Sequence, residues 1–217
     1  MIDPSEVASR VADIRNDIAR LSSHSVSIIA VTKTFSTHAW TAARDAGCDG
    51  IGENYAQELL DKIRELPAPL PIHVIGAIQS NKVKALAPYV SLWQGVDRPS
   101  IVSEIAKRAP GASVLLQVNT THEESKSGIS PNGVDELREL AESAGLTVAG
   151  LMTLGPTHGS SDDIRSSFIS LRALADDHQL RECSMGMSGD YRIALECGST
   201  MIRIGSMLFG ERHRSDQ

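Results

Sequence analysis

Short apolar runs alternate with segments of helical periodicity along the chain. Residues 26–31 are almost entirely apolar and rich in β-branched side chains, as expected for a strand that helices cover on both faces. Between such runs, apolar residues recur three or four positions apart, and several of these segments stop at a glycine. The runs that we interpret as strands are 26–31, 50–51, 72–75, 92–93, 114–118, 148–152, 183–187 and 201–204.

This alternation predicts the fold class. About eight strands that alternate with helices fit an α/β protein with a single (β/α)8 TIM-type barrel better than a doubly wound sheet. The glycine fingerprint G-x-G-x-x-G does not follow the first strand, which weakens the doubly wound alternative. No repeat, low-complexity run or linker divides the chain, so we expect residues 1–217 to form one domain.

An additional helix is predicted before the first strand. Asp3 would cap this helix, Pro4 would occupy its first position, and Glu6 would complete a capping box. We expect the helix to dock on the barrel rather than to contribute chemistry. The apolar residues that fall on its inner face are Val7, Val11, Ile14, Ile18 and Leu21.

Composition argues against several classes of protein. A net charge of −6 and an aromatic content of 4% do not suit a nucleic-acid binder, which needs a basic face and stacking rings. No apolar run approaches the roughly 20 residues that span a bilayer, and the acidic amino terminus lacks the layout of a signal peptide. We therefore expect a cytoplasmic protein with neither nucleic-acid nor membrane partners.

The cysteines and histidines suggest no covalent or metal framework. Cys48, Cys183 and Cys197 are widely spaced and form no C-x-x-C pair, so we expect buried thiols rather than a disulfide or a zinc site. The histidines also lack metal-ligand spacing, and His73, on a predicted strand, is expected to be a core or supporting residue.

In a barrel, the residues that follow the strands share one rim, where ligand chemistry collects, whatever their separation in sequence. Candidate chemistry should therefore be sought among the side chains at these positions. The rim would bring together Lys33, Asn54, His73, Asn119, Met152, Ser188 and the segment 203–206.

Lys33 ends the first predicted strand and has two interpretations. It could be a solvated loop amine whose stem lies along the surface. It could also be a desolvated amine that attacks a carbonyl group and forms an imine. The strand alone does not distinguish them.

The loops after the last two strands are rich in small residues. The segments 185–189 and 204–206 contain Ser188, Gly205 and Ser206, where backbone N–H groups can approach an anion such as phosphate. A helix that begins near Ser188 would direct its positive end at that anion. Alternatively, Ser188 is a plain helix cap and the glycines are plain turns.

Arg203, on the last predicted strand, is a further candidate ligand contact. Alternation places it on the face opposite Ile202 and Ile204, and if that face points into the barrel, the buried guanidinium requires a partner. A salt bridge to Glu196 or another carboxylate is one solution, and a ligand acceptor such as a ring nitrogen is the other.

One ligand, pyridoxal 5'-phosphate (PLP), would use an imine-forming lysine, a phosphate site and a partner for its ring nitrogen. Arginine at that position would leave the ring nitrogen unprotonated, and the ring would then be a poor electron sink.

The chain resembles the pyridoxal phosphate homeostasis proteins, which are alanine racemase N-terminal-domain-like. The resemblance implies a barrel with Lys33 as the imine lysine, Asn54 near the ring hydroxyl and Arg203 at the ring nitrogen. Ser188, Gly205 and Ser206 would surround the phosphate. The matching blocks are AVTK (30–33), GENYAQE (52–58), HVIGAIQSNK (73–82), GLMT (150–153), SMGMS (184–188), GSTMIRIG (198–205) and FG (209–210).

The resemblance also implies a role in carrying or buffering intracellular PLP, with apo PLP enzymes as candidate recipients and no firmly assigned catalytic residue. A PLP-dependent amino-acid racemase of weak activity is the alternative. Racemases carry a second domain whose tyrosine is the second acid/base, and only about a dozen residues follow the last strand here, so we expect little racemase activity and a monomer. Tyr55 and Tyr191 could substitute for that tyrosine, although packing roles suit them better.

A lysine-imine aldolase without a cofactor is a further rival, and it predicts a colourless protein. Other lysines could also form the imine. Lys82 and Lys84 lie on a predicted helix and are expected to form a solvated basic patch, with guidance of a second phosphate as a weaker alternative. Lys126 is expected to be exposed and salt-bridged in its loop.

Overall fold

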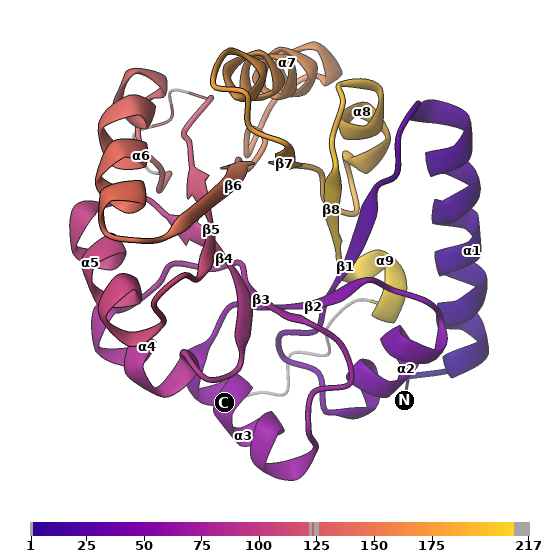
Figure 1. The fold of residues 1–217 in the computed structure, drawn as a ribbon. Helices are drawn as coiled ribbons and strands as arrows, with labels where there is room; N and C mark the ends of the chain where they lie inside the picture. The colour runs from indigo at the N-terminus through magenta and orange to yellow at the C-terminus, as the bar shows by residue number, and fades with distance from the viewer. Residues whose placement is uncertain (1, 122, 124–125, 211–217) are drawn as a thin grey trace.

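A closed parallel barrel forms the centre of the molecule (Figure 1). The structure, a computed structural model, describes residues 2–121, 123 and 126–210. Each strand pairs with the next one along the chain, and β8 returns to β1 with Ile29 opposite Arg203. The predicted (β/α)8 barrel is confirmed. The strands are β1 (Ser27–Val31), β2 (Gly50–Glu53), β3 (Ile72–Val74), β4 (Val90–Val96), β5 (Ser113–Gln117), β6 (Thr147–Met152), β7 (Glu182–Ser184) and β8 (Met201–Ile204).

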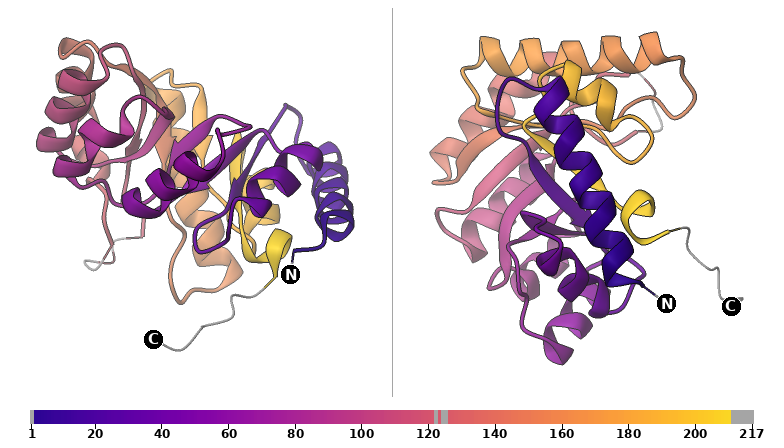
Figure 2. Two further views of the ribbon diagram at one scale, coloured as in Figure 1. Left: turned by 90° about the horizontal axis from the view of Figure 1, so that it is seen from below. Right: turned by 90° about the vertical axis from the view of Figure 1, so that its right-hand side faces the viewer.

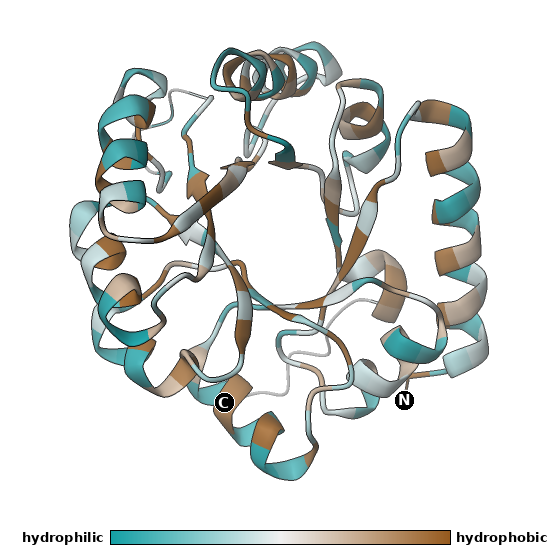
Figure 3. Cartoon of the chain, viewed as in Figure 1, coloured by the Kyte–Doolittle hydropathy of each residue, from teal (hydrophilic) through white to brown (hydrophobic). Residues whose placement is uncertain are grey.

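Helices form a ring outside the barrel and turn their apolar faces toward it (Figure 3). None of the described helices is long and apolar enough to cross a membrane. The helices are α1 (Pro4–Leu21), α2 (His38–Asp45), α3 (Ala56–Glu65), α4 (Ser80–Leu86), α5 (Pro99–Arg108), α6 (Val134–Ser143), α7 (Ser161–Asp177), α8 (Tyr191–Glu196) and α9 (Ser206–Phe209), and a 3-10 turn spans Pro131–Gly133.

The predicted amino-terminal helix is α1, and it belongs to the ring (Figure 2). It contacts α2, α8 and α9, and its buried residues join Ile28 and Ile202 in one apolar cluster. Asp3 caps the helix by accepting from the Ser5 N–H at 2.9 Å. The predicted capping box is wrong, because the Glu6 carboxylate instead pairs with Arg10 one turn later, at 2.7 Å.

Alternation along the strands separates the barrel interior from the helix layer. Ile29, Leu115 and Met201 form part of an apolar cluster inside the barrel, whereas Ile28 and Ile202 face the helices. Residues two positions farther along β1 and β8 therefore point inward, and these are Val31 and Arg203.

Two strands end three residues away from the predicted boundary. The strand predicted at 92–93 is longer, because buried Gln94 and Gly95 continue it inside the barrel. The strand predicted over 183–187 ends at Ser184, because Gly186 has a φ of +96°, which no regular strand contains. In both cases, the residues near the strand end are polar or glycine, so a hydrophobicity pattern does not reveal the boundary.

Candidate functional site

A cavity of about 860 Å3 opens at the carboxyl ends of the strands. Residues after β1, β2, β7 and β8 meet there, although they are up to 173 positions apart in sequence (206 minus 33). Sequence reasoning missed Gln117 and Ser127 in its wall. All six predicted site residues line it: Lys33, Asn54, Ser188, Arg203, Gly205 and Ser206.

The backbone on both sides of Lys33 is anchored. The carbonyl of Thr32 accepts a hydrogen bond from Lys62 Nζ at 2.7 Å, and the N–H of Thr34 donates to Glu58 Oε1 at 2.5 Å. Thr34 adopts a φ of +70°, a left-handed conformation that costs free energy for a β-branched residue. These two hydrogen bonds hold the strained turn that presents Lys33, which is half-buried at the cavity wall.

A buried ionic cluster supplies that anchor. Lys62 Nζ lies 2.7 Å from Glu53 Oε1 and 2.6 Å from Glu58 Oε1, with only 5% of Lys62 and 1% of Glu53 exposed. Thr32 Oγ1 and Trp40 Nε1 also donate to Glu53 Oε1, at 2.7 and 3.1 Å. Burial raises the pKa of Glu53, and Lys62 opposes that effect.

Arg203 is a buried cation whose hydrogen bonds go to neutral groups. Its Nη1 donates to Ser184 Oγ at 2.6 Å and its Nη2 to the carbonyl of Thr153 at 2.8 Å, with 3% of the residue exposed. Burial lowers the pKa of Arg203 to about 10. The alternative of a salt bridge to Glu196 is wrong, because Glu196 pairs with Arg165 at 2.5 Å on the surface. Arg203 lines the cavity and so can donate to an acceptor on a ligand.

A chain of hydrogen bonds continues from Arg203 into the barrel. Arginine can only donate, so the Ser184 hydroxyl accepts from it and donates to Gln94 Oε1 at 2.7 Å. The Gln94 amide nitrogen then donates to His73 Nδ1 at 2.8 Å. His73 must therefore be neutral, and burial lowers its pKa to about 4. The predicted core role of His73 is confirmed, as the end of this chain.

Ser188 joins the two loops that were predicted to hold an anion. Its Oγ accepts from the N–H groups of Gly205 at 3.3 Å and Met207 at 3.2 Å. The helix predicted near Ser188 is α8, which begins at Tyr191 with Asp190 at its N-cap, so the alternative that Ser188 caps this helix is wrong. Asp190 occupies the intervening turn, where its Oδ1 accepts from the Met187 N–H at 2.5 Å. The site therefore rests on loop geometry rather than on a helix end at Ser188.

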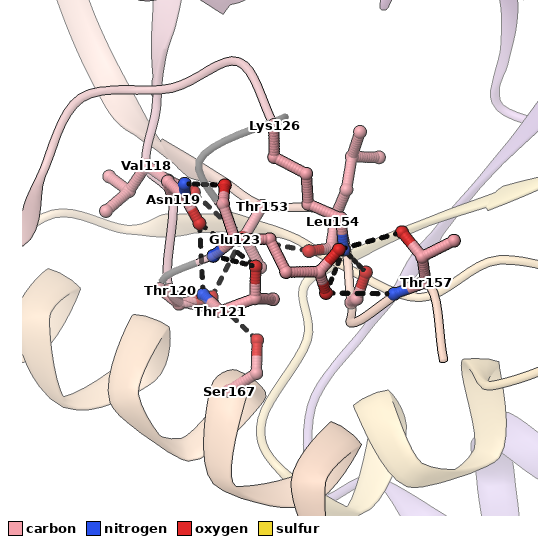
Figure 4. A network of polar contacts seen from close by, with 11 residues as sticks. Val118, Asn119, Thr120, Thr121, Glu123, Lys126, Thr153, Leu154, Thr157 and Ser167 are labelled. Atoms are coloured by element: carbon pink, nitrogen blue, oxygen red, sulfur yellow. Dashed lines mark hydrogen bonds and ion pairs between the residues drawn. The ribbon is translucent and has the colours of Figure 1, made fainter. Parts of the chain in front are cut away.

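Lys126 is a second amine at the cavity (Figure 4). Its Nζ pairs with Glu123 at 3.2 Å and also donates to the carbonyl of Gly155. The predicted salt bridge is confirmed, but the predicted exposure is wrong, because only 13% of the side chain is accessible. No sequence signal places Lys126 at the cavity, because its position depends on the β-bridge between Val118 and Ile129.

The two tyrosines considered as acid/base groups lie outside this cavity. Tyr191 is buried against α1, where its hydroxyl donates to Asp17 Oδ2 at 2.7 Å. Tyr55 is 54% exposed and borders a different cavity. Among the described residues that line the site, the ionisable side chains are those of Lys33, Lys126 and Arg203.

The fold and the site define a barrel of the alanine racemase N-terminal-domain class, and the family model with that description matches residues 2–213. The chain is 41% identical over 180 residues to the pyridoxal phosphate homeostasis protein of Aquifex aeolicus, which covers 77% of this chain and 79% of the relative. It is 36% identical to the Pasteurella multocida protein of the same name, over 88% of both chains. The chain belongs to the pyridoxal phosphate homeostasis protein family.

Solved structures agree with this assignment. The structure of PipY from Synechococcus elongatus with PLP bound has a TM-score of 0.80 and 30% identity, and the match covers 94% of this chain and 100% of PipY. An alanine racemase from Corynebacterium glutamicum matches with a TM-score of 0.75 but 14% identity, over 63% of its length. The racemase therefore shares the fold, and this likeness carries no argument about activity.

Proposed function

We propose that this protein binds PLP in the barrel cavity and acts in PLP homeostasis as a carrier or buffer of the cofactor. The proteins that it resembles bear that name, and PipY has been solved with PLP bound. The observation that supports the proposal most is the convergence of the six predicted residues on one cavity.

The groups at the cavity fit the chemistry of PLP. Lys33 would hold the aldehyde covalently, with release of one water. Ser188, Gly205 and Ser206 would hold the phosphate, and Arg203 would donate to the ring nitrogen. Two features support this fit. The Arg203 guanidinium donates hydrogen bonds only to neutral acceptors, and the buried Asn54 Oδ1 has no hydrogen-bond partner within the described structure.

Bound PLP would supply an electrophilic carbonyl group and a ring that accepts electrons. Arg203 keeps its own proton at any physiological pH, so it would donate to the ring nitrogen and leave that nitrogen unprotonated. This weakens the ring as an electron sink. The protein's own residues therefore favour binding of the cofactor over its use in catalysis.

The alternative function, a weak amino-acid racemase, requires a second group that moves a proton at the substrate. Lys126 is the amine available for this, but Glu123 and the Gly155 carbonyl hold it. We therefore infer that robust catalysis is absent. Racemisation of D- or L-alanine by the loaded protein, at a rate that depends on Lys126, would contradict this inference.

The proposed carrier role also concerns where the protein acts and which proteins receive PLP from it. We infer that the protein works as a cytoplasmic monomer and transfers PLP to apo PLP enzymes. Incubation of the loaded protein with an apo PLP enzyme should restore that enzyme's activity. A rate no greater than that given by the same concentration of free PLP would contradict a carrier that delivers its cargo.

The covalent attachment has a direct test. Purified wild-type protein should absorb visible light, and borohydride reduction followed by peptide mapping should place the label on Lys33. Lys33→Ala should lose both signals, whereas Lys84→Ala, at an exposed position on α4, should keep them. A colourless wild type would favour the cofactor-free aldolase, and a label on Lys82, Lys84 or Lys126 would contradict the assignment of Lys33.

A further inference from the structure

The hydrogen bonds behind Arg203 reach across the barrel to β4. Ser184, which accepts from the guanidinium, lies on the neighbouring β7, but its own acceptor is Gln94 on β4. β4 and β8 are four places apart in the closed ring of eight strands, so this contact crosses the barrel interior (Figure 1). Ser184 and Gln94 are both fully buried, and water therefore cannot replace either partner.

Two anchors fix the plane of the Arg203 guanidinium. Its Nη2 donates to the carbonyl of Thr153 at 2.8 Å, and its Nη1 donates to the hydroxyl of Ser184 at 2.6 Å. The first anchor belongs to the backbone, where the Thr153 N–H donates to the Ser184 carbonyl at 3.1 Å. The second anchor is a hydroxyl group, which rotates about its C–O bond and can donate or accept. It holds Arg203 only while its own proton points elsewhere.

Gln94 determines where that proton points. Its Oε1 accepts from the Ser184 hydroxyl at 2.7 Å. The opposite end of the Gln94 amide lies 3.0 Å from the Met201 sulfur, which can only accept, and 2.8 Å from His73 Nδ1. The amide nitrogen must therefore be at that end. If the amide were reversed, Gln94 and Arg203 would both donate to Ser184, and the Ser184 proton would lose its acceptor.

This fixed polarity restricts what Arg203 can bind in the cavity. A guanidinium has five N–H groups and no acceptor, and the two anchors use two of those groups. Arg203 also lines the cavity, so the ligand atom that it meets must be an acceptor. A ring nitrogen with a free lone pair fits this position, whereas a protonated ring nitrogen or a ring C–H group does not.

We propose that Gln94 is a positioning residue that acts through Ser184 to align Arg203 with the ring nitrogen of PLP, so that the site selects ligands whose ring nitrogen is an unprotonated acceptor. This inference rests on the proposed function and adds the origin of its ligand specificity. Gln94 is not among the residues that line the cavity, so its effect on a ligand is indirect. A residue that merely stabilised the barrel would change the affinity for every ligand alike.

A pair of ligands separates specificity from stability. PLP and its deaza analogue, in which a C–H group replaces the ring nitrogen, share the aldehyde, the ring hydroxyl and the phosphate. Absorbance titration of the cofactor-free, full-length protein gives the ratio of their two dissociation constants. Gln94→Leu should reduce the wild-type preference for PLP by about fivefold or more, because it misaligns a charge-assisted hydrogen bond. An unchanged ratio in the folded variant would overturn the inference, whereas a wild type that binds no PLP would contradict the proposed function itself.

Further variants test the route through Ser184. Ser184→Ala removes the anchor and should reduce the preference by a similar factor. In that background, Gln94→Leu should reduce it no further, and an additional reduction would contradict an effect transmitted by Ser184. Gln57→Leu, at an exposed position on α3, is the matched control and should leave the ratio unchanged. Circular dichroism establishes that each variant folds.

The wild-type protein provides a test that does not depend on the folding of any Gln94 variant. The chain requires neutral His73 with its proton on Nε2, because Nδ1 accepts from Gln94. Nitrogen NMR distinguishes the two tautomers of an imidazole group, and comparison with His73→Asn identifies the signals of His73. A proton on Nδ1 would mean that the Gln94 amide is reversed, and this result would overturn the proposal.

Discussion

At the scale of single residues, the side chains that line the cavity were predictable, but their partners inside the protein were not. Arg203 could be placed on the face opposite Ile202 and Ile204, and the structure has these two residues toward the helices, so that Arg203 lies inside the barrel. Ser184, Gln94 and His73 lie 19, 109 and 130 positions from Arg203 (differences of residue numbers), and only the closure of the barrel brings them into one chain of hydrogen bonds. No local pattern carries that information.

The neutral state of His73 predicts a dependence of stability on pH. Its pKa is about 4 in the folded protein, below the usual 6.5, so between these values the unfolded chain binds a proton that the folded protein does not. The free energy of unfolding should therefore fall as the pH drops from about 6.5 to 4, by up to about 3 kcal/mol from this residue. Urea unfolding at pH 7 and pH 5 measures the effect.

The control for this prediction is His73→Asn, whose side-chain oxygen can accept from Gln94 as Nδ1 does. The variant should lose stability less steeply than the wild type over the same interval. Equal slopes for the two proteins would assign the acid sensitivity to other groups.

At the scale of elements, the strand-to-helix connections determine the site, and the sequence describes them only in part. Small residues after β7 and β8 marked two loops that line the cavity. The helix expected near Ser188 begins at Tyr191, and Asp190 forms the turn before it by accepting from the Met187 N–H. The ionic cluster behind Lys33 was not anticipated, since Glu53 and Lys62 follow no motif spacing and face the helix layer rather than the rim.

Replacing Lys62 should disturb the element that carries Lys33. Lys62→Met leaves the buried Glu53 and the partly exposed Glu58 without their cation, which should lower the free energy of unfolding by about 3–5 kcal/mol. It also removes the hydrogen bond to the Thr32 carbonyl, so bound PLP should dissociate faster. Urea unfolding and stopped-flow absorbance measure the two effects. Lys107→Met, exposed on α5, is the control, and equal PLP release from both variants would show that the cluster does not position Lys33.

Gly186 offers a test of the turn after β7. It has a φ of +96°, and a Cβ added there would lie 2.6 Å from the Cβ of Ala194. Gly111 shares the left-handed conformation, at +78°, but an added Cβ meets nothing within 4 Å. Gly111→Ala should therefore cost only the conformational strain, about 1 kcal/mol. Gly186→Ala should cost clearly more and weaken PLP binding, and similar losses for both variants in thermal unfolding would contradict a steric role.

At the scale of the whole molecule, the fold was predictable because one rule, alternation of buried strands and amphipathic helices, repeats around the barrel. The ring position of α1 was less evident, since the pattern indicates an inner face but not the surface that it covers. In the structure, α1 lies against α2, α8 and α9 and joins the cluster over β1 and β8. The short α9 follows β8, and α1 completes the cover beside it.

Removing buried volume from α1 should therefore destabilise the barrel as a unit. Ile14 is fully buried in this cluster, so Ile14→Ala should cost about 2–5 kcal/mol and lower the Tm by roughly 5–15 °C. Ile169→Ala, at an exposed position on α7, should change the Tm little. Scanning calorimetry measures both, and a second transition that appears only in Ile14→Ala would show that α1 detaches separately from the barrel.

The composition of the cavity wall has a consequence for how a ligand arrives. The described residues that line the wall include three basic side chains and no carboxylate, in a protein whose net charge is −6. Field lines from buried basic groups concentrate in a low-dielectric opening. An anionic molecule that is repelled at long range should thus be drawn inward once it comes within about a Debye length, roughly 8 Å, of the opening. The same arrangement would slow the escape of a doubly charged phosphate.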